Sequence, residues 1–240
     1  MGQEDNEMSK MHVCILMFQG HDVLDYTGPY EVFANILDNP GSEYPRQIFD
    51  ITLIATDMII QSSRSLCVNR DISIQEAFAR IMVYDILVVP GGPVRTLKGL
   101  CRPDSTELDF IRSFAALPER VGRQSRVILS VCTGSLLLGY LGLLKGRKAT
   151  THSKALDTLQ YVCDSSGGSG ETGTEVIKAR YVDGGALGNG TRIVTSGGIS
   201  SGIDASLYVL SLVAGREVAT GAMQIIEFDR SSSLREIEYI

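Results

Sequence analysis

Hydrophobic residues in this chain form short runs, and between these runs apolar positions recur every three or four residues. Short runs predict buried strands, and the wider spacing predicts helices. The expected strands are residues 13–18, 49–55, 86–89, 127–131 and 193–195. The expected helices are residues 29–37, 74–79, 108–116, 135–144 and 203–213. Strands that alternate with helices predict an α/β fold with a parallel sheet.

Polar residues mark where several of these helices begin. Ser73 and Glu76 form a capping box pattern, and residues 104–107 supply a cap and an acid for a first turn. Thr27-Gly28-Pro29 places a proline near the first position of the first expected helix. Residues 59–68 have a polar centre between apolar ends, which predicts a small hairpin beside the sheet.

Length and composition predict one domain. The chain has 240 residues, of which 44% are hydrophobic, enough for one sizeable core. We expect the domain to span residues 11–228, between a flexible N-terminal tail at 1–10 and a C-terminal tail at 229–240. Residues 165–174 are rich in glycine and serine and predict a flexible loop within this domain, followed by a strand-like segment at 176–182.

Charge and cysteine content argue against several classes of partner. The net charge is −6 and no basic cluster is present, which argues against a nucleic-acid partner. The sequence lacks an apolar run of about 18 residues and a secretory signal, so we expect no membrane association. Five cysteines, without CxxC spacing, indicate reduced thiols in a cytoplasmic protein. Neither a metal-ligand pattern nor a nucleotide-binding motif is evident, so we expect a small-molecule partner and no cofactor.

Cys132 lies where the expected strand 127–131 runs directly into an expected helix. A sharp strand-to-helix turn leaves its central side chain strained and exposed, as in a nucleophile elbow. The N–H groups and the dipole at the start of the helix favour a thiolate. Cys132 is therefore the predicted nucleophile; the alternative is a small buried residue that only packs.

Three further features follow expected strands, where ligands gather in an open α/β sheet. Pro90-Gly91-Gly92 follows strand 86–89 and is either an oxyanion hole or an ordinary turn. Asp25 stands before the first expected helix and either caps it or exchanges protons with Cys132. His152 stands where a later strand is expected to end, and either pairs with Cys132 or makes structural hydrogen bonds.

Two other residues have open or structural interpretations. Tyr26 either lines the pocket or packs in the core. Asp204 is expected to order the start of the helix that runs to residue 213.

Five segments form a distinctive set over residues 11–228: Asp-Tyr-Thr-Gly-Pro at 25–29, Val-Val-Pro-Gly-Gly at 88–92, Ser-Val-Cys-Thr-Gly-Ser at 130–135, and the segments 142–152 and 195–204. Together they resemble the ThiJ/PfpI family of the class I glutamine amidotransferase-like superfamily. The resemblance is nearest to the isocyanide hydratase subgroup and to the amino-terminal domains of AraC-type regulators. Asp25 is the distinguishing residue, since many family members have a glutamate there.

The resemblance implies a flavodoxin-like sandwich, in which helices flank a mostly parallel central sheet. It also implies that Cys132 attacks an isocyanide carbon, that Asp25 shuttles the proton and that Thr133 is a nearby polar contact. The N–H groups of Gly92 and Thr133 would polarise the reacting group. Water would then convert a covalent thioimidate into an N-formamide, and a low thiolate pKa would suit this chemistry.

The other expected site residues are His152 as a further catalytic group, and Gly91, Gly92 and Tyr26 as substrate-binding residues. Because relatives of this kind usually pair with the active site near the subunit contact, we expect a homodimer. The sequence departs from the hydratases at Gln19 and Ser153, which are expected to border the pocket.

The same features bear on other functions that this scaffold supports. The few residues after 228 argue against an AraC-type DNA-binding domain, and His152 lacks the acidic partner expected for glutamine hydrolysis. A glyoxalase-like enzyme and an enzyme that tailors a specialised metabolite remain alternatives. From another class, a redox sensor or chaperone would oxidise Cys132 without turnover.

Overall fold

A seven-stranded sheet forms the centre of the molecule, in a computed structural model that describes residues 10–37, 47–120, 122–166 and 172–228. The strands lie in the order β10-β11-β7-β6-β1-β2-β5. Neighbours pair in parallel, except that β10 is antiparallel to β11. The strands are β1 (Met11–Leu16), β2 (Phe49–Ala55), β5 (Ile72–Ser73), β6 (Ile86–Val89), β7 (Val127–Ser130), β10 (Tyr181–Ala186) and β11 (Arg192–Ser196).

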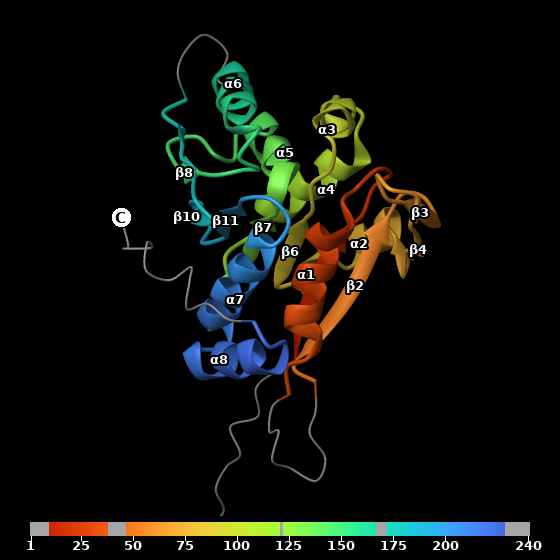
Figure 1. Cartoon of the computed structure of the whole chain (residues 1–240), viewed down its shortest axis with the longest axis vertical. Helices are drawn as coiled ribbons and strands as arrows, with labels where there is room; N and C mark the ends of the chain where they lie inside the picture. The colour runs from red at the N-terminus through yellow and green to blue at the C-terminus, as the bar shows by residue number, and fades with distance from the viewer. Residues whose placement is uncertain (1–9, 38–46, 121, 167–171, 229–240) are drawn as a thin grey trace, which may run out of the picture.

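Helices cover both faces of this sheet (Figure 1). One face carries α1 (Val23–Ala34), α7 (Ser201–Val213) and α8 (Arg216–Ile225). The opposite face carries α2 (Ile74–Ala79), α3 (Val94–Leu100), α4 (Thr106–Ala115), α5 (Ser135–Tyr140) and α6 (Leu156–Ser166). The inner strand order, β2-β1-β6-β7-β11, is that of a flavodoxin-like fold, so the predicted fold class is confirmed.

Short elements complete the described part of the chain. Two 3-10 helices are η1 (Ile81–Val83) and η2 (Cys132–Gly134). The predicted hairpin is present as β3 (Ile59–Gln61) and β4 (Cys67–Asn69), which form a sheet of their own. A second small sheet pairs β8 (Lys148–Ala149) with β9 (Glu175–Val176).

Alternation along each central strand divides the interior into two cores. In and just after β1, Val13, Ile15 and Met17 pack toward α1 and α7. Cys14 and Leu16 point to the other side and join the core of the opposite helices. Because successive strand residues face opposite sides of a sheet, a run that is apolar throughout serves both cores.

Several predicted boundaries are confirmed. The bounds of β2, α2 and β6 match the expected ranges. The Ser73–Glu76 capping box is present, and Ser105 caps α4 by accepting the N–H of Leu108. These elements were predictable because each boundary depends on neighbouring residues alone.

Other boundaries were wrong. The first helix begins at Val23, not at 29, and Pro29 lies inside it. Burial of Tyr26 and Phe33 against the sheet offsets the hydrogen bond that the proline removes. The helix expected at 135–144 ends at Tyr140, and Gly142 follows with a left-handed φ of 71°.

The predicted strand at 176–182 was also wrong, since the chain forms β9 and β10 on either side of an irregular segment. Helices α3, α6 and α8 were not predicted. The expected tails and the centre of the 165–174 loop lie outside the described residues, apart from Lys10.

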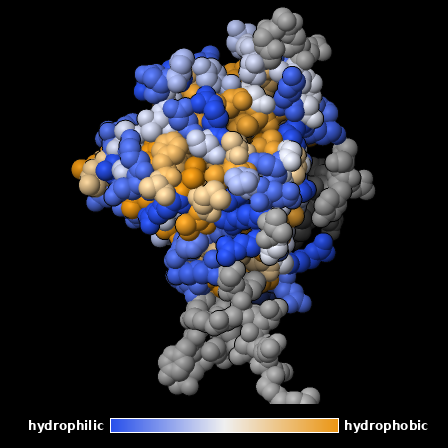
Figure 2. All heavy atoms as spheres, turned by 180° about the vertical axis from the view of Figure 1, so that it is seen from behind, coloured by the Kyte–Doolittle hydropathy of each residue, from blue (hydrophilic) through white to orange (hydrophobic). Residues whose placement is uncertain are grey.

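In the described ranges, none of the helices combines the length and apolar character of a membrane span. Seen from behind, hydrophilic residues surround several small hydrophobic areas (Figure 2).

Candidate active site

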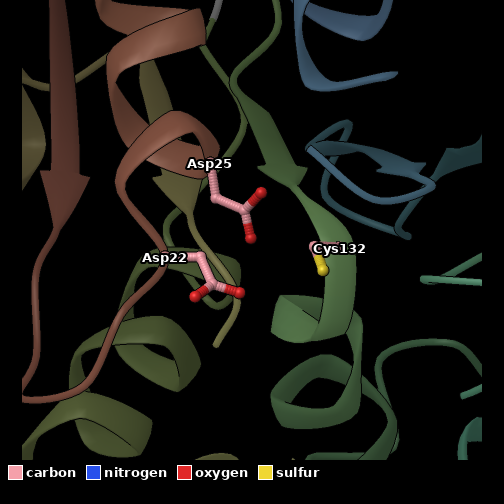
Figure 3. Close-up of side chains that lie close together, drawn as sticks. All are labelled: Asp22, Asp25 and Cys132. Atoms are coloured by element: carbon pink, nitrogen blue, oxygen red, sulfur yellow. The ribbon is translucent and has the colours of Figure 1, made fainter. Parts of the chain in front are cut away.

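Three adjacent strands deliver the candidate residues to one edge of the sheet. Asp25 comes from the first turn of α1, which follows β1. Gly91 and Gly92 follow β6, and Cys132 follows β7. The carboxyl ends of parallel strands are where ligands bind in such sheets. Figure 3 shows the carboxylates of Asp22 and Asp25 on the side of Cys132 that faces α1.

Cys132 is held in a strained turn. Its φ of 57° is in the left-handed region, which costs a residue with a side chain about 1–3 kcal/mol. Its N–H donates to the carbonyl of Gly197 at 3.1 Å, and its carbonyl accepts the hydroxyl of Thr151 at 2.9 Å. At Gly134, a Cβ would lie 2.3 Å from the carbonyl oxygen of Val89, so only glycine fits. The turn therefore has the geometry of a nucleophile elbow.

Asp25 is fully buried beside this cysteine. Its Oδ2 accepts the N–H of Gly91 at 3.2 Å, and the Cys132 sulfur lies within 4.8 Å of the carboxylate, whose Oδ1 has no hydrogen-bond partner among the described residues. A Cβ at Gly91 would come within 2.9 Å of Oδ2, so the absence of a side chain makes room for this contact. Asp25 is in the helix rather than at its cap, and Asp22 is the N-cap residue.

Burial and charge raise the pKa of both partners. Burial, followed by the charge of Asp22, raises the pKa of Asp25 to about 6. Burial and the neighbouring Asp25 raise the pKa of the Cys132 thiol to about 12, outweighing the N–H of Thr133 that bonds to the sulfur. This direction is opposite to the one that a helix start favours, because the cysteine lies in the interior next to an anion. At neutral pH the pair is a thiol beside a carboxylate that can accept its proton.

Thr133 ties the elbow to the glycine loop. Its hydroxyl donates to the Gly92 carbonyl at 2.6 Å and accepts the Gly92 N–H at 2.9 Å. The N–H of Gly92 is thus already bonded, and that of Thr133 bonds to the sulfur of Cys132. Thr133 therefore links the Cys132 turn to the loop after β6, and its predicted catalytic role stays a prediction.

A cavity of about 370 Å³ opens above the elbow, lined by Cys132, Thr133, Gly92 and His152 among others. His152 packs its ring against Gly198, and no hydrogen bond joins it to Cys132 within the described ranges. Gly91 and Tyr26 do not line this cavity. Tyr26 packs in the core edge-on to His21, with ring centres 5.1 Å apart. The binding roles of these residues stay predictions.

Asp22 is a site residue that sequence reasoning missed. Its carboxylate accepts the Ser63 hydroxyl at 2.5 Å, and it raises the pKa of Asp25. The signal was present, because acids three residues apart share one side of a helix. The predicted helix start at residue 29 left both acids outside the helix, so this spacing was not recognised. Ser63, Arg64, Arg95 and Lys154 also line the cavity and were not singled out.

The same side chains have the donor atoms of a cation site. Asp22, Asp25 and Cys132 offer two carboxylate oxygens and one sulfur, all within 4.8 Å of one another. Three protein ligands suit a catalytic zinc site. A metal there would hold the sulfur as a ligand and occupy the carboxylate that otherwise accepts its proton, so metal binding and thiol attack exclude each other.

Comparisons with known proteins identify the family. A model of the DJ-1/PfpI family matches residues 11–212. The chain is 33% identical to isonitrile hydratase of Pseudomonas putida over 210 residues, which cover 87% of this chain and 75% of that protein.

Solved structures show the same fold. A ThiJ/PfpI family protein from Pseudomonas syringae superposes with a TM-score of 0.68 at 24% identity, over 98% of this chain and 83% of that one. Oxidized DJ-1 of Toxoplasma gondii superposes with a TM-score of 0.64 at 19% identity, over 90% of this chain and 98% of that one.

Proposed function

Because the chain belongs to the DJ-1/PfpI family, we propose that it is an isonitrile hydratase-like enzyme, which adds water to an isonitrile and releases an N-formamide. The observation that carries the proposal is the buried Asp25–Cys132 pair, in which a carboxylate of raised pKa lies within 4.8 Å of a thiol. The identity to an isonitrile hydratase supports the choice of substrate class.

In the first step, the sulfur of Cys132 attacks the terminal carbon of the isonitrile. The thiol proton passes to the Asp25 carboxylate as the carbon–sulfur bond forms. Asp25 then returns this proton to the same carbon, which gives a thioimidate in which the nitrogen keeps a double bond to carbon. One base that accepts and returns a proton is enough, because the thiol never has to exist as a free thiolate.

In the second step, water adds to the thioimidate carbon and breaks its double bond to nitrogen. One water proton reaches the nitrogen through Asp25, and the oxygen stays on carbon. The carbon–sulfur bond breaks as the formyl carbonyl forms, and the departing sulfur, stabilised by the Thr133 N–H, takes up the remaining proton. The sum is one isonitrile and one water converted to one N-formamide.

The same pair favours an enzyme over a redox sensor. Peroxide reacts with thiolates, and a buried thiol whose pKa is raised is a slow target. A proton acceptor beside that thiol has no role in a passive sensor but is required for addition of the thiol to a carbon. This difference supports turnover as the role of Cys132.

The decisive assay follows formation of the formamide from para-nitrophenyl isocyanide, with methylglyoxal in parallel. We expect turnover of the isocyanide by the wild type, and its loss in Cys132→Ser and Asp25→Ala. Cys163→Ser is the matched control, since Cys163 is also buried but lies in the core on the opposite face of the sheet from α1 and α7. Turnover of methylglyoxal alone, or formamide production that survives Cys132→Ser, would reject the hydratase proposal.

Three further expectations accompany the proposal. Activity should persist in a metal chelator, because the mechanism uses no cofactor. Sedimentation should give a homodimer. Fractionated cells should yield the protein with the cytoplasm rather than with membranes.

A further inference from the structure

The wall of the Cys132 cavity carries three cationic side chains. Arg64 comes from the turn between β3 and β4, Arg95 from α3, and Lys154 from the loop before α6. These segments are far apart in the sequence and lie around one opening. The group formed by Arg64, Arg95 and Lys154 is called the cationic rim below.

The cationic rim is not neutralised by the protein. Among the residues that the structure describes, none of its three side chains forms an ion pair or a hydrogen bond. The one carboxylate in the cavity wall, Asp22, is hydrogen-bonded to Ser63 instead. Isolated exposed cations are common, but three on one cavity of a chain with net charge −6 form a local field of opposite sign.

Charges of both signs meet at this cavity. The carboxylates of Asp22 and Asp25 lie within 4.8 Å of the Cys132 sulfur, and the cationic rim lines the same cavity as Asp22 and Cys132. The isonitrile group carries no net charge, so it can approach Cys132 without repulsion from the nearby carboxylates. A negative charge at the far end of the same small molecule would meet the rim, and a volume of about 370 Å³ fits such a molecule.

We propose that the substrate is a small isonitrile that bears an anionic group, which the cationic rim binds while Cys132 attacks the isonitrile carbon. This inference rests on the proposed function. The shared chemistry is negative charge, and either a carboxylate or a phosphate monoester supplies it.

The first test compares 4-isocyanobenzoate, 4-isocyanophenyl phosphate and the neutral methyl ester of the benzoate. We expect the wild type to prefer an anion over the ester in kcat/KM, and the better anion identifies the group. Replacing the rim by Arg64→Gln, Arg95→Gln and Lys154→Gln together should lower kcat/KM for that anion about tenfold and leave the ester nearly unchanged. Added salt should weaken the preference.

The control replaces Arg123, Lys145 and Arg216 by glutamine, which removes the same charge from surfaces outside the cavity lining. It should keep the preference for anions. A wild type that prefers the ester, or a control that loses the preference as fully as the rim variant, would overturn the inference.

The second test does not need turnover. Iodoacetate and iodoacetamide alkylate the same thiol and differ in charge, so their rates at Cys132, measured by peptide mass, report the field of the cavity. We expect the rim variant to slow iodoacetate several-fold relative to iodoacetamide, and the control variant to leave the ratio unchanged. An unchanged ratio in the rim variant refutes the cationic rim even if isonitriles are hydrated. A changed ratio without hydration supports an anionic ligand and rejects the hydratase proposal instead.

Discussion

Asp25 and Asp204 occupy matching positions and have opposite surroundings. Each lies in the first turn of a helix, α1 or α7, and the two helices lie side by side on one face of the sheet (Figure 1). Each side chain is buried. Asp204 accepts the Nε–H of Arg180 at 2.6 Å, as part of an ion pair. Asp25 has a thiol as its neighbour and, within the described ranges, no cation.

The difference teaches that burial alone does not set the role of a carboxylate. A cation beside Asp204 stabilises its charge, so that acid fixes the segment before β10 to α7. Without a cation, burial raises the pKa of Asp25 into the range in which protons are exchanged. One acid is held in an ion pair and the other has the raised pKa that the proposed proton transfer uses, although both hold the same place in their helices.

The largest expected effect is a difference in kcat/KM between variants of the two acids. Asp25→Asn removes the proton acceptor, and we expect kcat/KM for the isonitrile to fall by roughly 10² to 10⁴. Asp204→Asn should change it by no more than about threefold, because that carboxylate is paired with Arg180. Steady-state kinetics of both variants measures this. Equal losses in the two variants would show that the comparison is mistaken.

For stability we expect the opposite order, in which Asp25→Asn is more stable than the wild type and Asp204→Asn is less stable. In the wild type the folded pKa of Asp25, about 6, exceeds its usual value of 3.8. Protonated Asp25 therefore contributes to the free energy of unfolding in full below pH 3.8, and this contribution is lost as the pH rises through 6. Asp25→Asn escapes this loss, so at neutral pH it should gain up to about 3 kcal/mol in the free energy of unfolding.

Asp204→Asn loses a charged hydrogen bond and should cost about 1–2 kcal/mol, moderated because Arg180 is partly exposed. Urea unfolding at neutral pH and near pH 4 checks both values. The gain in Asp25→Asn should vanish at the lower pH; a gain of equal size at both would exclude ionisation as its cause.

The smallest expected effect concerns Asp22. Wild-type kcat/KM should fall as pH drops below about 6, because protonated Asp25 cannot accept the thiol proton. The charge of Asp22 raises the pKa of Asp25, so Asp22→Asn should move this acidic limb to lower pH. Asp204→Asn should leave it in place. A limb that moves upward in Asp22→Asn would contradict the assigned cause.

The sequence predicted what depends on local pattern. Apolar runs placed the strands, and a cysteine directly after one of them identified the elbow at 132. The raised pKa of that cysteine was not predictable, because it depends on burial and on Asp25, more than a hundred residues away in the chain. Asp22 was not predicted because Pro29 indicates a helix that begins near residue 29. In the structure α1 begins at Val23, and Asp22 is its N-cap residue. The cationic rim was missed because its members come from three distant segments without a shared pattern.

The contact between Cys132 and Gly197 also bears on how the protein is made. Gly197 directly follows β11, the last strand of the sheet to leave the ribosome. A nascent chain that ends before this strand already contains Asp25, Gly91 and Cys132 but lacks the carbonyl that accepts the Cys132 N–H. The hydrogen bond that holds the Cys132 turn can therefore form only after β11 and the residue that follows it have been synthesised.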